Sequence, residues 1–333
     1  MYSEVLELLR SSVEVYVLKD RGILEKYKRE MMEMVRTVFI DTKWNPKKRQ
    51  NSKKHVYYDL EKDVFIEVDS LIELKDYDEI YLDSSIFPNM WKQLREVISN
   101  GRRAYYFTRP WKWRDIRGRF KEDLKTRTGR VSKSDNGDAY LLWKVYELSL
   151  VKNNTYRYFR LLTIVDVELR PLLMRENMLY ENLQRIRNAS IVGVDVGSNV
   201  KILEKMVEDV RREIVDRAIK LIPGFIDIAK SLGLNRNDID GLTGLAGELV
   251  YNRSTSSYSS SVRFHGLYKA KGYDVRRMKK YSDNAQRYLI MLTNAILWKN
   301  GEYRPPRYKD MRGVLWMVTE ARKQMGLAGG AGA

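Results

Sequence analysis

The chain contains no cysteine and only two histidines among its 333 residues. Disulfide bonds and thiolate metal sites are therefore excluded, and so is a zinc site rich in histidine. Any bound metal ion must be held by carboxylates, and oxygen ligands favour Mg²⁺ or Mn²⁺. The lack of cysteine also fits a cytoplasmic protein, which is the localisation we expect.

Long apolar runs are missing as well. No stretch approaches the roughly 18 consecutive apolar residues that a membrane-spanning helix needs. The first residues lack the charged, apolar and small-residue succession of a signal peptide. We therefore expect no membrane partner.

Acidic residues are fewer than basic ones: 44 against 61, which gives a formal net charge of +17. A basic excess of this size attracts polyanions over about a Debye length and raises encounter rates. Solubility alone is the simpler explanation, but the excess is clustered in the chain, and this favours a nucleic-acid partner. With 44% hydrophobic residues, the chain is long enough for two domains with real cores.

The N-terminal part of the chain alternates between strand and helix patterns, after a predicted helix over residues 1–35 and with a basic loop over 43–54. Short β-branched and aromatic runs between polar turns predict strands, and a spacing of three to four between apolar residues predicts helices. The predicted strands are 37–41, 55–60, 64–68, 79–83 and 103–108, and the predicted helices are 87–98 and 138–150. The fold class expected is α/β, with a mixed five-stranded sheet flanked by helices.

From about Tyr156 onward, helical patterns replace the strands. Two amphipathic stripes, Leu169–Ile186 and Leu203–Leu221, flank a glycine-punctuated segment at 191–199, and this arrangement predicts an antiparallel helical hairpin. A further all-α region follows, with a polar insertion at Arg253–Ser261. The expected divisions are 1–151 for the sheet domain, 152–222 for the hairpin, 223–325 for the C-terminal helical domain and 326–333 for a disordered tail.

Four aspartates stand at the ends of these predicted elements. Asp41 closes the first strand, Asp83 closes the fourth, and Asp135 and Asp138 begin the helix after the basic segment. The strand pattern resembles RNase-H-like folds, in which the first and fourth strands are neighbours, so the four carboxylates would converge. Like charges this close are costly unless cations neutralise them. Two Mg²⁺ ions about 4 Å apart would do so and would support phosphodiester hydrolysis.

Each aspartate also has a purely structural explanation. Asp41 could be a turn residue, Asp83 could cap a helix, and Asp135 or Asp138 could cap the helix that it begins. The other acids of the strands, Asp59, Glu67 and Asp69, are expected to face away from the site.

Basic and aromatic residues are interleaved between residues 102 and 133. Cations contact phosphates and exposed aromatic rings can stack on bases. The alternative is a solvated loop whose tryptophans plug the core, and Tyr105 and Phe107 are expected in the core. The predicted DNA contacts are Arg109, Trp111, Lys112, Trp113, Arg114, Arg117, Arg119 and Lys133.

A second basic cluster lies near the C-terminal end, and two separated clusters indicate two nucleic-acid strands or two ligands. Its members are the predicted RNA contacts Arg263, His265, Lys269, Lys271, Arg276, Arg277, Lys279, Lys280 and Arg287.

Several segments, in order, resemble the RuvC-like domain and the following parts of transposases guided by a bridge RNA. The segments are VFID at 38–41, EIYLDSS at 79–85, KSDNGDA at 133–139, LRPLLMRENMLYENLQRIRN at 169–188, and the C-terminal GLTGLAG, VRFHGLYKAKG and YSDNAQRYLIMLTNAIL. The resemblance covers roughly residues 37–300 and implies that Asp41, Asp83, Asp135 and Asp138 are both catalytic and metal-binding.

Two departures from that family matter. Asp83 stands where the family usually has glutamate, and Lys271-Gly272 stands where it has a nucleophilic serine followed by glycine. Other serines occur at 254–261, a segment typical of a flexible loop, and at Ser282. Without a serine nucleophile, hydrolysis by metal ions is what remains.

The chain is therefore more similar to TIGR-associated Tas proteins of the TasR type. These combine a RuvC-like nuclease domain, a coiled coil and a Nop-like RNA-binding domain. The resemblance implies a homodimeric, Mg²⁺- or Mn²⁺-dependent, RNA-guided DNA endonuclease of a prokaryote or virus, with guide RNA and target DNA as partners. The alternatives are a bridge-RNA-guided transposase and a catalytically inactive ribonucleoprotein scaffold.

Two glycine-rich segments resemble functional motifs but have simpler explanations. Gly193–Gly197 looks like the first strand of a RuvC fold, yet only a helix follows it, so a hairpin turn is expected. Gly241–Gly247 lacks the Lys-Ser/Thr pair of a phosphate-binding loop, so close helix packing is expected there.

Overall fold

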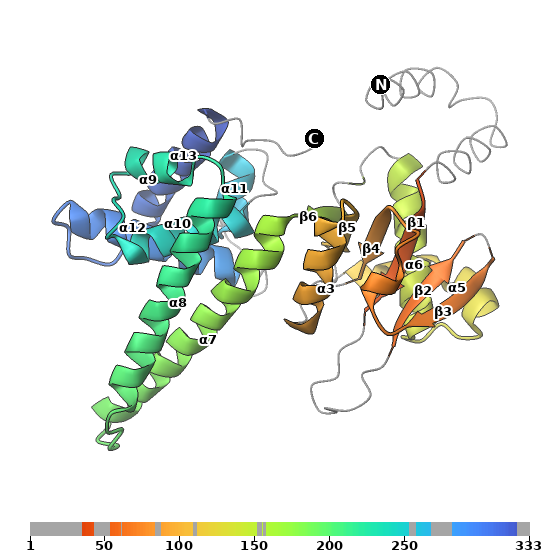
Figure 1. Cartoon of the computed structure of the whole chain (residues 1–333), viewed down its shortest axis with the longest axis horizontal. Coiled ribbons are helices and arrows are strands. Elements are labelled where there is room, and N and C mark those ends of the chain that lie inside the picture. Colours follow the sequence, from red (N-terminus) through yellow and green to blue (C-terminus); the bar gives the residue numbers. More distant parts are fainter. Residues whose placement is uncertain are drawn as a thin grey trace, which may run out of the picture. The chain divides into compact units, whose positions relative to one another are not determined.

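The computed structural model describes residues 35–42, 54–60, 62–83, 88–108, 112–151, 155, 158–252, 258–267 and 282–324. The chain forms two compact units that meet in sequence between Leu161 and Leu162 (Figure 1). Apart from residues 35 and 54, the predicted N-terminal helix and the basic loop lie outside the described residues. The predicted tail lies outside them as well.

The first unit is built on a six-stranded mixed sheet with the order β3-β2-β1-β4-β5-β6. Strands β1 and β2 pair antiparallel, as do β2 and β3, whereas β4 runs parallel to both β1 and β5. The predicted adjacency of the first and fourth strands is confirmed. The strands are β1 Thr37–Asp41, β2 His55–Asp59, β3 Val64–Val68, β4 Glu79–Leu82, β5 Arg103–Phe107 and β6 Phe159–Leu162.

Strand β6 was not expected, because its four residues look like the start of the helical region. It lies next to β5 at the edge of the sheet, and the backbone N–H of Thr108 donates to the Tyr158 carbonyl at 2.8 Å. Phe159 packs on Tyr81, with ring centroids 4.9 Å apart. Residues 159–162 therefore form a strand because they pack against an existing sheet edge, and not because of their local sequence pattern.

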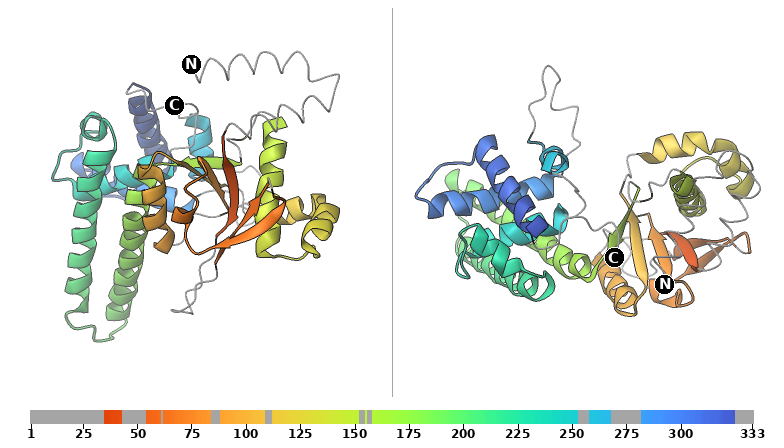
Figure 2. Two further views of the ribbon diagram at one scale, coloured as in Figure 1. Left: turned by 45° about the vertical axis from the view of Figure 1, so that its right-hand side comes forward. Right: turned by 90° about the horizontal axis from the view of Figure 1, so that it is seen from above.

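Helices cover both faces of the sheet. Figure 2, in its view from above, shows α3 (Pro88–Ser99) on one side and α6 (Asp135–Val151) on the other. The basic segment that precedes α6 contains two short helices, α4 (Trp113–Arg119) and α5 (Lys121–Thr128), where the sequence alone did not predict any. A short 3-10 helix, η1, spans Leu71–Glu73.

The second unit begins with the predicted hairpin. Helix α7 spans Ile164–Ile191 and α8 spans Asn199–Leu221, and the two helices lie side by side (Figure 1). The Gly193–Gly197 segment forms the turn between them, as expected. In this turn the backbone N–H of Gly197 donates to the Asp195 side chain at 2.9 Å.

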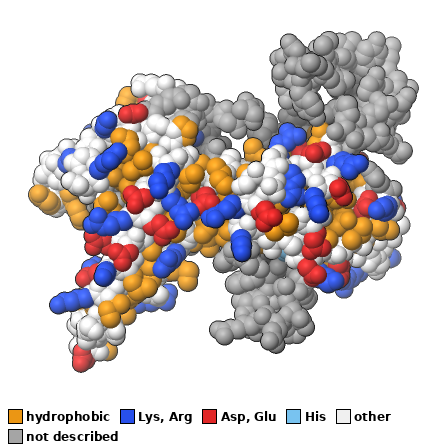
Figure 3. All heavy atoms as spheres, in the orientation of Figure 1, with side chains coloured by type: hydrophobic (Ala, Val, Ile, Leu, Met, Phe, Trp, Pro, Cys, Tyr) orange, Lys and Arg blue, Asp and Glu red, His pale blue; other side chains and the backbone are white. Residues whose placement is uncertain are grey.

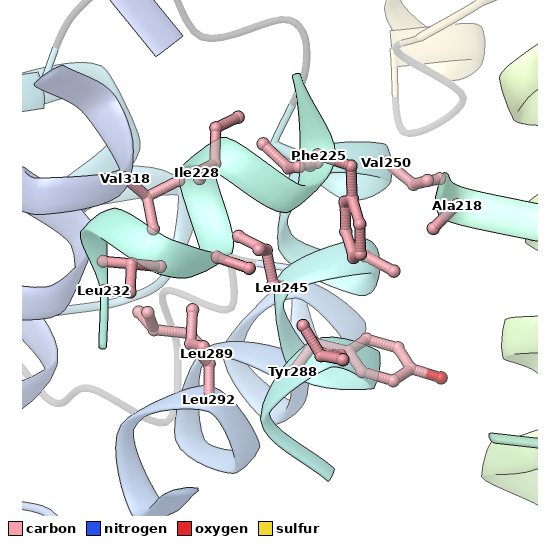
Figure 4. Close-up of a cluster of buried hydrophobic side chains, with 14 of the residues drawn as sticks. Ala218, Phe225, Ile228, Leu232, Leu245, Val250, Tyr288, Leu289, Leu292 and Val318 are labelled. Atoms are coloured by element: carbon pink, nitrogen blue, oxygen red, sulfur yellow. The ribbon is translucent and has the colours of Figure 1, made fainter. Parts of the chain in front are cut away.

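The hairpin and the C-terminal helices, which we expected as separate domains, share one apolar core. Leu173 of α7 and Ile214 of α8 belong to the same buried cluster as Phe225, Leu245 and Leu289. Figure 4 shows part of this cluster. The remaining helices are α9 Phe225–Ser231, α10 Ile239–Tyr251, α11 Tyr258–Phe264, α12 Asp283–Lys299 and α13 Tyr308–Gln324. Helix α11 replaces part of the loop expected at 253–261.

The glycines of α10 allow it to pack closely on α12. A Cβ atom on Gly244 would lie 2.6 Å from the backbone nitrogen of Leu292, and one on Gly247 would lie 2.2 Å from Cγ of Tyr288. Real Cβ atoms essentially never lie this close to another heavy atom. The close-packing explanation of Gly241–Gly247 is therefore confirmed.

Candidate metal site and nucleic-acid surfaces

The carboxyl ends of β1 and β4 bring two of the predicted acids together. Ile40 and Leu82 are paired in the parallel register, and the backbone N–H of Asp83 donates to the Ile40 carbonyl at 3.1 Å. Asp41 ends β1 and is buried, with 2% of its surface exposed. Because parallel neighbours end at the same edge, Asp41 and Asp83 lie next to each other.

Hydrogen bonds fix the Asp83 carboxylate. Its Oδ1 accepts from the backbone N–H of Thr42 at 2.8 Å and from the Thr42 hydroxyl at 2.6 Å. Burial raises the pKa of Asp83, and the nearby Asp138 charge raises it further. The bonds from Thr42 and the Asp41 side chain partly oppose this rise. The Asp83 carboxyl group therefore interacts with the side chains of both Asp41 and Asp138.

Helix α6 supplies Asp138. The Ser134 side chain accepts a hydrogen bond from the backbone N–H of Gly137 at 3.1 Å, and the Ser134 carbonyl accepts from Asp138 N–H at 2.9 Å. Ser134 therefore caps the helix, which leaves neither Asp135 nor Asp138 needed for that task. Asp138 is buried, whereas Asp135, one turn earlier, is partly exposed.

Arg117 of α4 supplies a positive charge at this cluster. Its guanidinium forms an ion pair with Oδ1 of Asp138, and it also lies 5.8 Å from the centre of the Trp113 ring. The Arg117 side chain is 19% exposed and that of Asp138 is 5% exposed. A metal ion bound to Asp138 Oδ1 would have to compete with this arginine.

The donor chemistry of the cluster fits Mg²⁺ or Mn²⁺, because carboxylate oxygens are the ligands that these ions prefer. Within the described residues, no three acidic or histidine side chains are already arranged as a metal-ion shell. The Arg117 ion pair balances part of the negative charge instead. An entering cation would have to compete with that arginine.

The predicted DNA contacts differ in their surroundings. Trp113 is half-buried and packs against Phe107, with ring centroids 4.8 Å apart, so part of its ring belongs to the core and its contact with DNA stays a prediction. Lys112 and Arg117 pair with Asp115 and Asp138. Arg109 and Trp111 lie outside the described residues. The remaining predicted cations are exposed on this surface: Arg114, Arg119 and Lys133.

Two of the predicted RNA contacts bind partners within the protein. His265 is fully buried, and its ring nitrogens lie 2.6 Å from Glu248 Oε2 and 2.7 Å from the Ser261 carbonyl. Both hydrogen bonds require ring N–H groups. The raised pKa of His265 agrees with this: burial alone would lower the pKa, but the charge of Glu248 and the two hydrogen bonds together raise it by more. The prediction that His265 contacts RNA is therefore wrong.

Arg287 is the second of these. Its guanidinium donates to both oxygens of Glu176, at 2.6 and 3.0 Å. Arg211 of α8 binds the same carboxylate at 2.8 Å, and Tyr288 donates its hydroxyl at 3.1 Å. This network joins α7, α8 and α12, so Arg287 has a structural role. Arg263 is exposed, whereas Lys269, Lys271, Arg276, Arg277, Lys279 and Lys280 lie outside the described residues.

The sequence contains a signal for the Glu176 network. Glu176 is fully buried and stands midway between Leu169 and Leu183, on the apolar stripe of α7. Burial raises its pKa, but the charges and hydrogen bonds of Arg287 and Arg211 lower it overall. A charged residue at an apolar position of a helix predicts a buried partner of opposite charge.

Two of the serines considered as nucleophiles have structural roles. Ser282 caps α12, and its hydroxyl accepts from the backbone N–H of Ala285 at 3.2 Å. Ser261 is buried beside Asn252. Ser254, Ser256 and Ser257 lie outside the described residues, and Ser259 and Ser260 are exposed on α11.

Comparison with models of known protein families and with curated protein sequences gives no match. None of the helices among the described residues is both long and apolar enough to cross a membrane. On the face shown in Figure 3, basic and acidic side chains are interspersed over both units. The arrangement of Asp41, Asp83 and Asp138 is therefore the main guide to function.

Proposed function

We propose that the protein is a metal-dependent nuclease, and more specifically an RNA-guided DNA endonuclease with a RuvC-like site in its first unit. The convergence of Asp41, Asp83 and Asp138 is the observation that carries the proposal. These acids come from two neighbouring strands and a helix. Among the described residues, no contact that stabilises the fold requires three carboxyl groups at this place. The strand order supports an RNase-H-like fold by analogy, which fixes no activity by itself.

In this proposal Asp41, Asp83 and Asp138, with Asp135, hold two Mg²⁺ or Mn²⁺ ions. Such ions activate a water molecule and stabilise the leaving 3′ oxygen of a phosphodiester. Thr42 occupies Oδ1 of Asp83 with two hydrogen bonds and so orients the carboxylate. Ser134 fixes the first turn of α6, and therefore the position of Asp138. The exposed Arg114, Arg119 and Lys133 would contact the DNA backbone near the cut.

The second unit would hold the guide RNA. It corresponds to the coiled-coil hairpin and the Nop-like domain of the proposed family, and Arg263 together with the basic residues at 269–280 supplies positive charge. The proposed partners are a guide RNA, a target DNA and a second copy of the chain.

An inactive RNA-binding scaffold is the second candidate, and one observation favours it. Arg117 already neutralises Asp138, as an arginine would in a site that no longer takes a metal ion. The transposase alternative has less support, because Ser282 is used as a helix cap.

A Mg²⁺ titration of the purified complex with guide RNA and matched DNA tests the proposal. We expect cleavage that requires Mg²⁺ and is lost in Asp41→Asn, with RNA binding retained. Asp195→Asn, in the exposed hairpin turn, is the control and should cleave normally. Cleavage by Asp41→Asn at the wild-type rate would contradict the assigned site. RNA binding without any cleavage would favour the scaffold, and a covalent protein–DNA adduct would favour the transposase.

A further inference from the structure

Helix α13 has a second face that its packing does not explain. One face supplies Met311, Val314, Leu315 and Val318 to the core of the second unit. Lys309, Gly313 and Trp316 are spaced by four and three residues, so they share the opposite face. All three are exposed.

Aromatic side chains without a role in the core stand on this outer face and at its edge. Trp316 and Tyr308 are each 54% exposed, although the inner face of α13 is already filled. Two further exposed aromatic residues lie nearby in sequence: Trp298 at the end of α12, and Tyr303 in the link to α13. A tryptophan this exposed contributes little to folding and offers a flat surface for stacking.

Cations flank the aromatic residues. Lys309 is exposed and has no ion-pair partner in the described part of the chain. Arg312, one turn before Trp316, is held in place because its Nε donates to the Leu267 carbonyl at 2.8 Å. Tyr308, Lys309, Arg312 and Leu267 together line a shallow pocket. Exposed aromatic rings and positively charged side chains are therefore interleaved along this part of α13.

Gly313 gives a third, independent indication. Glycine destabilises the interior of a helix relative to alanine, so its presence needs a reason. A Cβ atom at this position would have nothing within 4 Å, in contrast to Gly244, whose Cβ would overlap α12. Packing among the described residues therefore does not require Gly313. Close approach of a bound molecule to the backbone beside Trp316 would require it.

We propose that this outer face of α13 binds single-stranded nucleic acid. A base stacks on Trp316, and Tyr308 offers a second ring. Lys309 and Arg312 contact phosphates, and Gly313 lets the strand approach the helix. Alternating rings and cations suit a polyanion with flat bases better than an apolar protein surface. This proposal rests on the nucleic-acid-binding part of the proposed function and is independent of the metal site.

Fluorescence anisotropy with the full-length protein tests the proposal, using a labelled 20-nucleotide RNA and a DNA of the same sequence. Loss of one stacked base predicts that Trp316→Ala raises Kd at least about fivefold, whereas Trp316→Phe stays near wild type. Lys309→Ala should flatten the dependence of log K on log salt by about 0.7. Ile202→Ala is the control: Ile202 is 53% exposed on α8, and its truncation should leave Kd unchanged.

Gly313→Ala separates binding from folding. It should raise Tm, because alanine favours the helix, and should weaken oligonucleotide binding at the same time. The proposal is overturned if Trp316→Ala and Gly313→Ala bind as wild type does, or if wild type binds neither strand. It is also overturned if Trp316→Ala changes only the oligomeric state in sedimentation. If Mg²⁺-dependent cleavage is intact in any of these outcomes, the proposed nuclease function is retained and only the nucleic-acid surface on α13 is rejected.

Discussion

Arg117 and Asp138 form an ion pair across the start of α6, beside Asp83 in the proposed metal site. The pair is largely buried, and Asp138 also raises the pKa of the neighbouring Asp83. The positive charge of Arg117 therefore stabilises the acidic cluster whenever no metal ion is bound. This relationship links the stability of the first unit to occupancy of the proposed site.

Arg117→Met should make the first unit more dependent on Mg²⁺. Without the arginine, Asp138 loses its partner, and we expect a loss of about 2 kcal/mol in the free energy of unfolding when Mg²⁺ is absent. Added Mg²⁺ should restore much of it, because the ion replaces the missing charge. Thermal unfolding with and without Mg²⁺ measures both effects. Arg114→Met is the matched control. An equal response of the two variants to Mg²⁺ would contradict competition between Arg117 and a metal ion for Asp138.

Asp83→Asn should stabilise the metal-free protein and abolish metal binding. The folded-state pKa of Asp83 is raised above its ordinary value, so its ionised form is disfavoured by folding. The cost is absent well below pH 3.8, grows as pH rises, and is complete above the folded-state pKa. At pH 7 the neutral asparagine avoids this cost and can still accept from Thr42. If Asp83→Asn has a lower Tm than the wild-type protein at pH 7 without Mg²⁺, ionised Asp83 does not destabilise the metal-free fold.

The His265–Glu248 pair should make the second unit less stable at alkaline pH. The folded-state pKa of His265 is raised above its unfolded value of 6.5, so protonation favours the folded state. The stabilisation is fully present below pH 6.5 and disappears as pH rises through the raised pKa. Urea unfolding between pH 5.5 and 9 measures it. His265→Gln should remove this dependence; an unchanged pH profile in that variant would assign the effect to other groups.

Gly244→Ala should destabilise the second unit by about 1–3 kcal/mol, because the added methyl group overlaps the backbone of Leu292. Gly118→Ala, in α4, adds the same methyl group where nothing lies within 4 Å and should be neutral or stabilising. Chemical denaturation of both variants provides the comparison. Equal stability of the two would mean that α10 and α12 are less closely packed than the structure shows.

The sequence was sufficient for five of the six strands and for three of the four acids in the proposed site. Alternating β-branched residues identify β1 to β5, and Asp41 and Asp83 follow from the strand ends. Patterns that depend on tertiary contacts were not predicted. Strand β6 exists because an edge was available, and α4 and α5 form within a segment that looked like a loop.

Side-chain roles were harder to predict than elements. Trp113, His265 and Arg287 each sit among basic residues in the sequence, yet the fold turns each of them toward a partner inside the protein. Charge clustering counts residues and does not show which way a side chain points. Conversely, Trp316 and Gly313 fit an ordinary amphipathic helix in the sequence, and only their exposure in the structure distinguishes them.

Binding of Mn²⁺, measured by electron paramagnetic resonance, tests the central claim most directly. Mn²⁺ replaces Mg²⁺ at carboxylate sites and is spectroscopically visible when free. We expect the wild-type protein to bind Mn²⁺, with Asp41→Asn and Asp83→Asn losing that binding and Asp195→Asn keeping it. A wild-type protein that binds no Mn²⁺, or an Asp41→Asn variant that binds it equally well, would contradict the account.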